Sequence, residues 1–160
     1  MKAVESNNLK KICHACQSCC CKNGAFFSSP ILSLAEAAAI ISRFPESQEI
    51  IQEVKGPTGE YYYTFSKTNP IGSCHFLDSK YRCKIYNIKP LDCQSYPIRA
   101  VHSYANIKFI VDKNCPASTN LHYKFIRNCR EIARQSINRF DKETYRHWLE
   151  NNVGLAKIQN

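Results

Sequence analysis

Residues 13–22 read CHACQSCCCK, which places five cysteines within nine positions of a 160-residue chain that has ten in all. Cys13, Cys16 and Cys19 follow one another at C-x2-C spacing, which sets sulfurs on the same side of a tight turn whose amides can point at them. The same spacing opens the cysteine run of bacterial ferredoxins, but the fourth cysteine of that run is missing here. The cluster is therefore an incomplete metal site that requires ligands from elsewhere in the chain.

Four cysteines further along the chain are candidates for those ligands. They lie in sequence rich in turn-forming residues, with Pro90 and Pro97 on either side of Cys93 and Pro116 directly after Cys115. Prolines restrict the backbone, so less conformational entropy is lost when such a loop binds a ligand. The pattern predicts one or two metal centres assembled from the N-terminal cluster and from Cys74, Cys83, Cys93 and Cys115.

The cysteine-containing segments resemble the YkgJ-type cysteine-cluster family, which is described as a zinc- or iron-chelating domain. That family has the blocks C-x2-C-G-x-C-C, C-x-F-L-D and C-x-I-Y-x2-R-P-x2-C-R-x-F-P, and the resemblance spans about residues 13–116. Gln17 replaces a glycine of the pattern, Lys89 and Gln94 replace arginines, and Tyr96 replaces a phenylalanine, but no thiol is lost. The matching residues are Cys13, Cys16, Cys19 and Cys20, then Cys74, Phe76, Leu77 and Asp78, then Cys83, Ile85, Tyr86, Pro90, Cys93 and Pro97.

The resemblance implies metal binding, either to zinc or to an iron–sulfur cluster of the 4Fe–4S type. The ferredoxin-like spacing and the Cys115-Pro116 pair favour iron–sulfur, whereas the dispersed downstream cysteines keep zinc open. Adjacent Cys19 and Cys20 point in different directions in most backbone conformations, so we expect them to serve different sites or roles, and Cys21 is the extra member of the triplet. The predicted ligands are Cys13, Cys16, Cys19, Cys20, Cys74, Cys83, Cys93 and Cys115.

The sequence leaves several function classes open. The leading interpretation is a metal-binding cysteine-cluster protein, with an iron–sulfur protein favoured and a zinc-stabilised interaction module with a basic surface as the alternative. A flagellin lysine methylase group has a similar cysteine pattern, which would imply methyl transfer. This chain is much shorter, however, and has no glycine-rich loop for S-adenosylmethionine. No nucleophile or general base stands out, so neither an enzymatic activity nor a substrate is assigned.

Composition restricts the partners and the compartment. The formal net charge is +9, and the surface stays basic after thiolates offset part of it, which is compatible with an acidic protein partner. A nucleic-acid partner is not expected, because Tyr61-Tyr62-Tyr63 is more typical of a strand than of a base-stacking platform. No apolar stretch is long enough to span a membrane and the N-terminus does not read as a secretory signal. We therefore expect a cytoplasmic protein with reduced thiols instead of disulfides.

We predict a small, loop-rich, single-domain α+β fold organised around the metal centre, with amphipathic helices at the C-terminal end. The expected divisions are a flexible tail at 1–11, a metal-binding domain at 12–116 and a helical extension at 117–160 that packs on the same domain. Ser33 and Glu36 form a capping box before a helix that ends at Pro45, and a second short helix is expected over 46–54. Strands are expected at 61–66 and 107–111.

The C-terminal part has the 3.6-residue period of an amphipathic helix, with Arg127, Arg130 and Arg134 on its polar side. Cys129 lies in the middle of the apolar side, so we expect it to be a small buried hydrophobe instead of a ligand. A shorter final helix is expected to begin at Asp141. The apolar side consists of Leu121, Phe125, Ile126, Cys129, Ile132, Ala133, Ile137 and Phe140.

Overall fold

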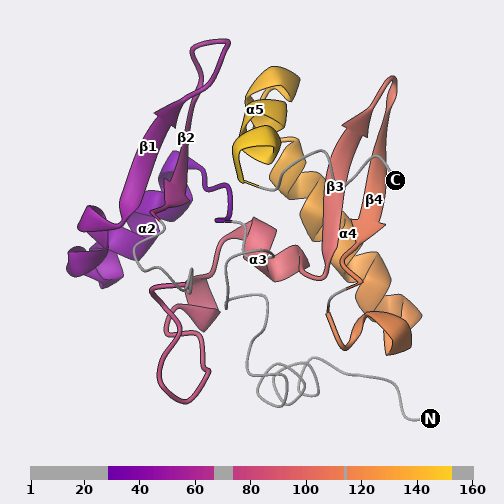
Figure 1. Ribbon diagram of the computed structural model, residues 1–160, viewed down its shortest axis with the longest axis horizontal. Coiled ribbons are helices and arrows are strands. Elements are labelled where there is room, and N and C mark those ends of the chain that lie inside the picture. Colours follow the sequence, from indigo (N-terminus) through magenta and orange to yellow (C-terminus); the bar gives the residue numbers. More distant parts are fainter. Residues whose placement is uncertain (1–28, 67–73, 114, 153–160) are drawn as a thin grey trace.

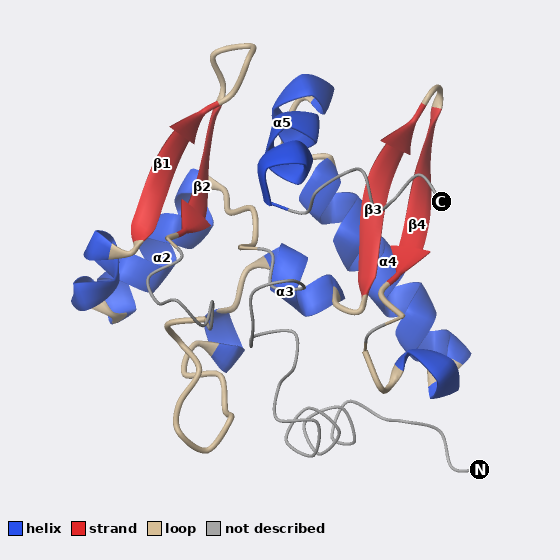
Figure 2. Cartoon of the chain, viewed as in Figure 1, coloured by secondary structure: helices blue, strands red, loops and turns tan. Residues whose placement is uncertain are grey.

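The computed structural model describes residues 29–66, 74–113 and 115–152, and the fold is α+β as predicted, with helices and two small antiparallel sheets (Figures 1 and 2). The predicted tail and the five N-terminal cysteines lie outside the described residues. None of the helices in the described ranges has the length and apolar character that crossing a membrane requires. In chain order the elements are α2 (Leu34–Arg43), η2 (Pro45–Glu49), β1 (Ile51–Lys55), β2 (Tyr61–Phe65), η3 (Tyr86–Ile88), α3 (Leu91–Ser95), β3 (Ile98–Ser103), β4 (Asn106–Val111), η4 (Ser118–Asn120), α4 (Tyr123–Ile137) and α5 (Lys142–Asn152).

The two hairpins stand on opposite sides of the molecule, with α5 between them and α3 near the centre (Figure 1). Strands β1 and β2 form one antiparallel pair, and strands β3 and β4 form the other. A core of buried side chains joins the two sides, because Ile31 and Tyr62 from the first pack with Ala133, Ile137 and Trp148 from the C-terminal helices. Burial of this continuous apolar surface is the main force that holds the C-terminal helices to the rest of the fold.

The predicted capping box at the start of α2 is confirmed. The Ser33 hydroxyl accepts a hydrogen bond from the Glu36 amide, and the Glu36 carboxylate accepts one from the Ser33 amide at 2.9 Å. Immediately before it, Leu32 pairs with Tyr63 on β2 through two backbone hydrogen bonds of 2.8 and 2.9 Å. The chain therefore enters the described fold as a third extended segment beside β2 and turns directly into α2.

The short helix predicted over 46–54 is wrong. Residues Pro45–Glu49 form a single 3-10 turn, and the chain then extends as β1, in which Ile51 lies opposite Phe65 and Lys55 opposite Tyr61. The segment has no strong local preference, because β-branched Ile51 and Val54 suit a strand as well as a helix. The aromatic strand β2 offers a complete set of ladder hydrogen bonds, so tertiary pairing decides the conformation.

The other predicted elements of this part of the chain are borne out. Strand β2 matches the expectation at 61–66, and β4 matches the one at 107–111. Helix α4 buries Cys129, Ala133 and Ile137, so Cys129 is the buried small residue that the periodicity predicts. Helix α5 begins after Asp141, whose Oδ1 accepts hydrogen bonds from the amides of Glu143 and Thr144 at 2.9 Å each.

The turn of the first hairpin packs on the start of α5. The Thr58 hydroxyl donates to Oδ2 of Asp141 at 2.6 Å and lies 3.1 Å from the Thr144 hydroxyl. Gly56 is buried at this contact, and a Cβ atom added to it would lie 2.4 Å from Oγ1 of Thr144. The glycine therefore allows a close approach between the hairpin and the C-terminal helix.

We expect Gly56→Ala to lower the free energy of unfolding by about 1–3 kcal/mol, because the added methyl group overpacks this contact. Urea unfolding of the single variant, of Thr144→Ala and of the double variant measures the coupling. The double variant should be less destabilised than the two single effects added together, since Thr144→Ala removes the atoms that clash. Strict additivity would show that the clash is relieved elsewhere.

Candidate metal centre

The loop that contains Cys74 and Cys83 folds back on itself. The Leu77 amide donates to the carbonyl of Cys74 at 3.0 Å, the Lys84 amide donates to the carbonyl of Phe76 at 2.8 Å, and Leu77 forms an isolated antiparallel bridge with Cys83. Both cysteines are partly buried against one apolar cluster, formed by Leu32, Ile40, Phe65, Phe76 and Ile85. The loop therefore brings two cysteines that are nine positions apart onto the same small core.

Cys93 lies on α3, within electrostatic range of both other thiols. Burial raises the pKa of the Cys93 thiol well above its ordinary value, and the charges of Asp92, Cys74 and Cys83 raise it further, whereas the Lys89 ammonium lowers it. The charges of Cys74 and Cys83 thus act on the Cys93 thiol, but the three side chains do not form a group arranged to hold a metal ion. A metal ion that binds there must displace protons, because thiolates and not thiols are the ligands.

Lys89 is the cation that acts on this region. Its Nζ lies 4.4 Å from the centre of the Tyr86 ring, and its carbonyl accepts a hydrogen bond from Nε2 of Gln94 at 2.8 Å. Burial raises the pKa of Cys129 to about 11, and Lys89 opposes this shift as it does at Cys93. A positive charge at this position suits an anionic metal–thiolate centre, as the arginine of the family pattern would.

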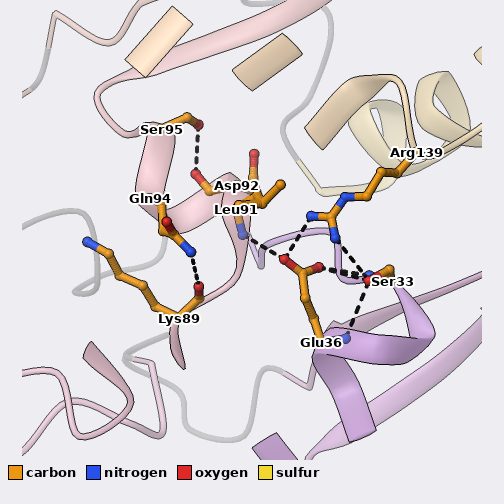
Figure 3. Close-up of polar contacts among 8 residues, drawn as sticks. All are labelled: Ser33, Glu36, Lys89, Leu91, Asp92, Gln94, Ser95 and Arg139. Atoms are coloured by element: carbon orange, nitrogen blue, oxygen red, sulfur yellow. Dashed lines mark hydrogen bonds and ion pairs between the residues drawn. The ribbon is translucent and has the colours of Figure 1, made fainter. Parts of the chain in front are cut away.

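Helix α3 is fixed in place by Glu36, as Figure 3 shows. One carboxylate oxygen of Glu36 accepts hydrogen bonds of 2.8 Å from the Leu91 amide and from Nη2 of Arg139, while the other accepts from Ser33. Nη1 of Arg139 also donates to the Ser33 hydroxyl at 3.1 Å. A single side chain of α2 thus connects the first residue of α3 with the segment between α4 and α5, and so positions Cys93.

Asp92, next to Cys93, has a role that its sequence did not indicate. Its side chain is buried, with the Arg99 guanidinium 3.8 Å away, and its carboxylate accepts a hydrogen bond from the Ile31 amide. The pKa of Asp92 is raised, mainly because the carboxyl group is buried and to a smaller extent because Glu36 is negatively charged. The Arg99 charge and the hydrogen bond from the Ile31 amide both lower it. Asp92 therefore connects α3, directly beside Cys93, with the segment at Ile31. No local pattern distinguishes it from an ordinary surface acid.

The first described residue is held equally firmly. The Ser29 hydroxyl donates to the carbonyl of Phe65 at 2.8 Å, and the Ser29 carbonyl accepts from Nε1 of Trp148 at 3.0 Å. Trp148 also lies under the Arg99 guanidinium, which is 5.2 Å from the ring centre. Ser29 is therefore buried and hydrogen-bonded to residues of β2 and α5.

The structure brings together only part of the predicted ligand set. Cys115 is buried in the segment after β4, where its amide donates to the carbonyl of Asp112 at 3.1 Å. Within residues 29–66, 74–113 and 115–152, no group of three or more His, Cys, Asp or Glu side chains is arranged to hold a metal ion. Four predicted ligands lie outside the described residues, namely Cys13, Cys16, Cys19 and Cys20.

The donor type of the described cysteines nevertheless restricts which metals could bind. Cys74, Cys83 and Cys93 offer sulfur donors, which suit zinc and iron–sulfur clusters and are poor ligands for magnesium or calcium. Their donor type therefore fits a thiolate-bound zinc or iron centre, although the described side chains do not form one by themselves. A fourth donor would complete the tetrahedral sulfur set that such centres require.

Comparison with known proteins agrees with this chemistry. A model of the CxxCxxCC family, described as a "putative zinc- or iron-chelating domain", matches residues 12–117, which include all eight predicted ligands and stop before α4. No curated protein and no solved structure matches the chain. The match covers well over half of the sequence and agrees with the suspected cysteine-cluster resemblance. The chain therefore belongs to the CxxCxxCC family of zinc- or iron-chelating domains.

Proposed function

We propose that this protein binds a metal–thiolate centre through Cys74, Cys83 and Cys93 together with cysteines of the N-terminal block, and that Cys115 contributes to the same or a second centre. The finding that supports this most directly is the match of residues 12–117 to a zinc- or iron-chelating family, and the charges of Cys74 and Cys83 also act on the Cys93 thiol. Neighbouring thiols without a metal add little to the free energy of folding, whereas a metal ion bound by several of them contributes its binding free energy to folding. Metal binding and folding should therefore be coupled.

The geometry also supports a contribution from the N-terminal block. Cys20 precedes Ser29 by nine residues, which span at most about 30 Å when extended. The chain at Ile31 is hydrogen-bonded to Asp92, directly beside Cys93. The stretch between Cys20 and Ser29 is therefore long enough to be compatible with a ligand role for Cys19 or Cys20 beside Cys93.

An iron–sulfur cluster is our first candidate and zinc our second. A bound cluster would supply reversible one-electron chemistry, whereas zinc held by four thiolates would be structural. In either case we expect the apolar cluster around Phe76 to support the thiolates of Cys74 and Cys83, and the Lys89 ammonium to offset negative charge at Cys93. Because the ligands must stay reduced, the proposal implies a reducing compartment such as the cytoplasm.

Anaerobic purification of the full chain, followed by absorption spectroscopy and metal analysis, tests the proposal. A brown protein that absorbs near 400 nm, with iron and acid-labile sulfide in equal amounts, is the expected result. A colourless protein with stoichiometric zinc would replace the cluster by zinc and preserve the thiolate centre. A protein that retains neither metal, even after reconstitution with iron and sulfide or with zinc, would contradict the proposal itself.

A further inference from the structure

The outer face of α4 has a basic depression that the metal centre does not involve. Its volume is about 440 Å³, and four of its six lining residues are cationic while one is anionic. All six side chains are exposed, and they belong to the helix that follows the part of the chain matched by the family model. The lining residues are Lys124, Arg127, Asn128, Arg130, Glu131 and Arg134.

Two of the arginines are held over a neighbouring strand. The guanidinium carbons of Arg130 and Arg134 lie 5.7 and 5.2 Å from the ring centre of Phe109 on β4, and Nη1 of Arg134 lies 2.9 Å from Oε2 of Glu131. Stacking on an aromatic ring restricts a long side chain before any partner arrives. Less conformational entropy is then lost on binding, so such arginines are better prepared to bind an anion than ordinary surface lysines.

The spacing of the arginines places them on one face of α4, which a second helix could lie against. Arg127, Arg130 and Arg134 are separated by three and four residues, so they form one stripe along α4 that rises about 10 Å. Carboxylates at the same three- and four-residue spacing on another helix would lie opposite this stripe. Each planar guanidinium can donate two parallel hydrogen bonds to a carboxylate.

We propose that this face of α4 docks an acidic helical segment of a protein partner. Charge complementarity carries the proposal, and the lining residues include no aromatic ring, because the exposed Tyr123 at the start of α4 is not among them. Base stacking on exposed rings, on which single-stranded nucleic-acid binding relies, is therefore not offered by these residues. The proposal goes beyond metal binding and does not depend on it.

Fluorescence anisotropy with the full chain provides the test. The probe is a labelled synthetic helical peptide with glutamates at three- and four-residue spacing, compared with a peptide of the same composition whose glutamates are scattered around the helix. A labelled single-stranded oligonucleotide of similar net charge is the third probe. The double variant Lys124→Glu/Arg127→Glu reverses two lining charges without touching the stack on Phe109, and Arg43→Glu/Lys80→Glu makes the same change in net charge elsewhere.

We expect the spaced peptide to bind more tightly than the scattered one, and its dissociation constant to rise about tenfold in the α4 variant but by less than about threefold in the control variant. Added salt should weaken the binding, since it screens exposed charges. Equal affinity for the two peptides, tighter binding of the oligonucleotide, or equal effects of the two double variants would overturn the proposal. Melting temperatures of both variants show whether the fold is kept.

Discussion

Replacing Cys83 by serine is expected to lower the metal content and the stability of the protein together. The substitution removes a thiol that we propose as a ligand, while nearly preserving the size of a side chain that packs against the Phe76 cluster. A serine hydroxyl is a poor ligand for zinc and for iron–sulfur clusters, so the centre loses a donor. We expect the metal dissociation constant to rise by at least about a hundredfold, since even losing an outer partner of a ligand weakens metal binding ten- to hundredfold.

The matched control is Cys129→Ala, which also removes a thiol. Cys129 is almost fully buried in α4 and lies outside the region matched by the family model, so this variant should lose about 1 kcal/mol of stability and keep its metal. Metal stoichiometry by mass spectrometry and melting temperature by circular dichroism are measured on both variants. If Cys83→Ser keeps its full metal content and its melting temperature, Cys83 is not a ligand.

Removing the carboxylate of Glu36 is expected to have the second largest effect. Glu36→Ala deletes the acceptor for the Ser33 amide, the Leu91 amide and the Arg139 guanidinium at once, and the Glu36 side chain is only 15% exposed. Loss of the cap alone costs about 1 kcal/mol, and leaving a partly buried guanidinium without its partner adds to this. We expect a loss of about 2–4 kcal/mol, or about 5–15 °C in melting temperature.

Two further variants separate the contributions at Glu36. Glu36→Gln keeps a single acceptor oxygen, so it can accept from the Ser33 amide or from the Leu91 amide but not from both, and it loses the ion pair with Arg139. It should therefore fall between Glu36→Ala and the native protein. Glu49→Ala removes an exposed carboxylate at the end of η2 and should change stability by less than about 0.5 kcal/mol. Because Glu36 positions the start of α3, Glu36→Ala should also weaken metal binding. Unchanged metal affinity would show that the position of α3 does not influence the metal centre.

The second hairpin illustrates what sequence patterns miss. Strand β4 was predicted, but its partner β3 was not, because the two-residue connection Tyr104-Ala105 lacks the glycine or asparagine that usually marks such a turn. Tyr104 adopts a positive φ of 23° there, which residue preferences disfavour for a tyrosine. The pairing of β3 with β4, together with the burial of Ile98 and Ala100, provides the stabilisation that the turn itself lacks.

The sequence by itself determined the longer helices α2, α4 and α5 and the donor chemistry of the candidate site. Local hydrogen bonds explain why α2 begins after Ser33 and α5 after Asp141, and the periodicity of α4 fixes the burial of Cys129, because these features depend on residues within one or two turns of helix. The spacing of the cysteines similarly identifies the family, since donor atoms are a property of the residues themselves.

Only the tertiary structure decided which distant residues meet. Strand β1 forms because β2 pairs with it, and α3, which contains Cys93, is positioned by the hydrogen bond from the Leu91 amide to Glu36 and by the contact between Asp92 and Ile31. The contacts of Glu36 with Leu91 and with Arg139 join residues that are more than fifty positions apart. No local pattern encodes them, because their free energy arises from burial and hydrogen bonding that exist only once the chain has folded.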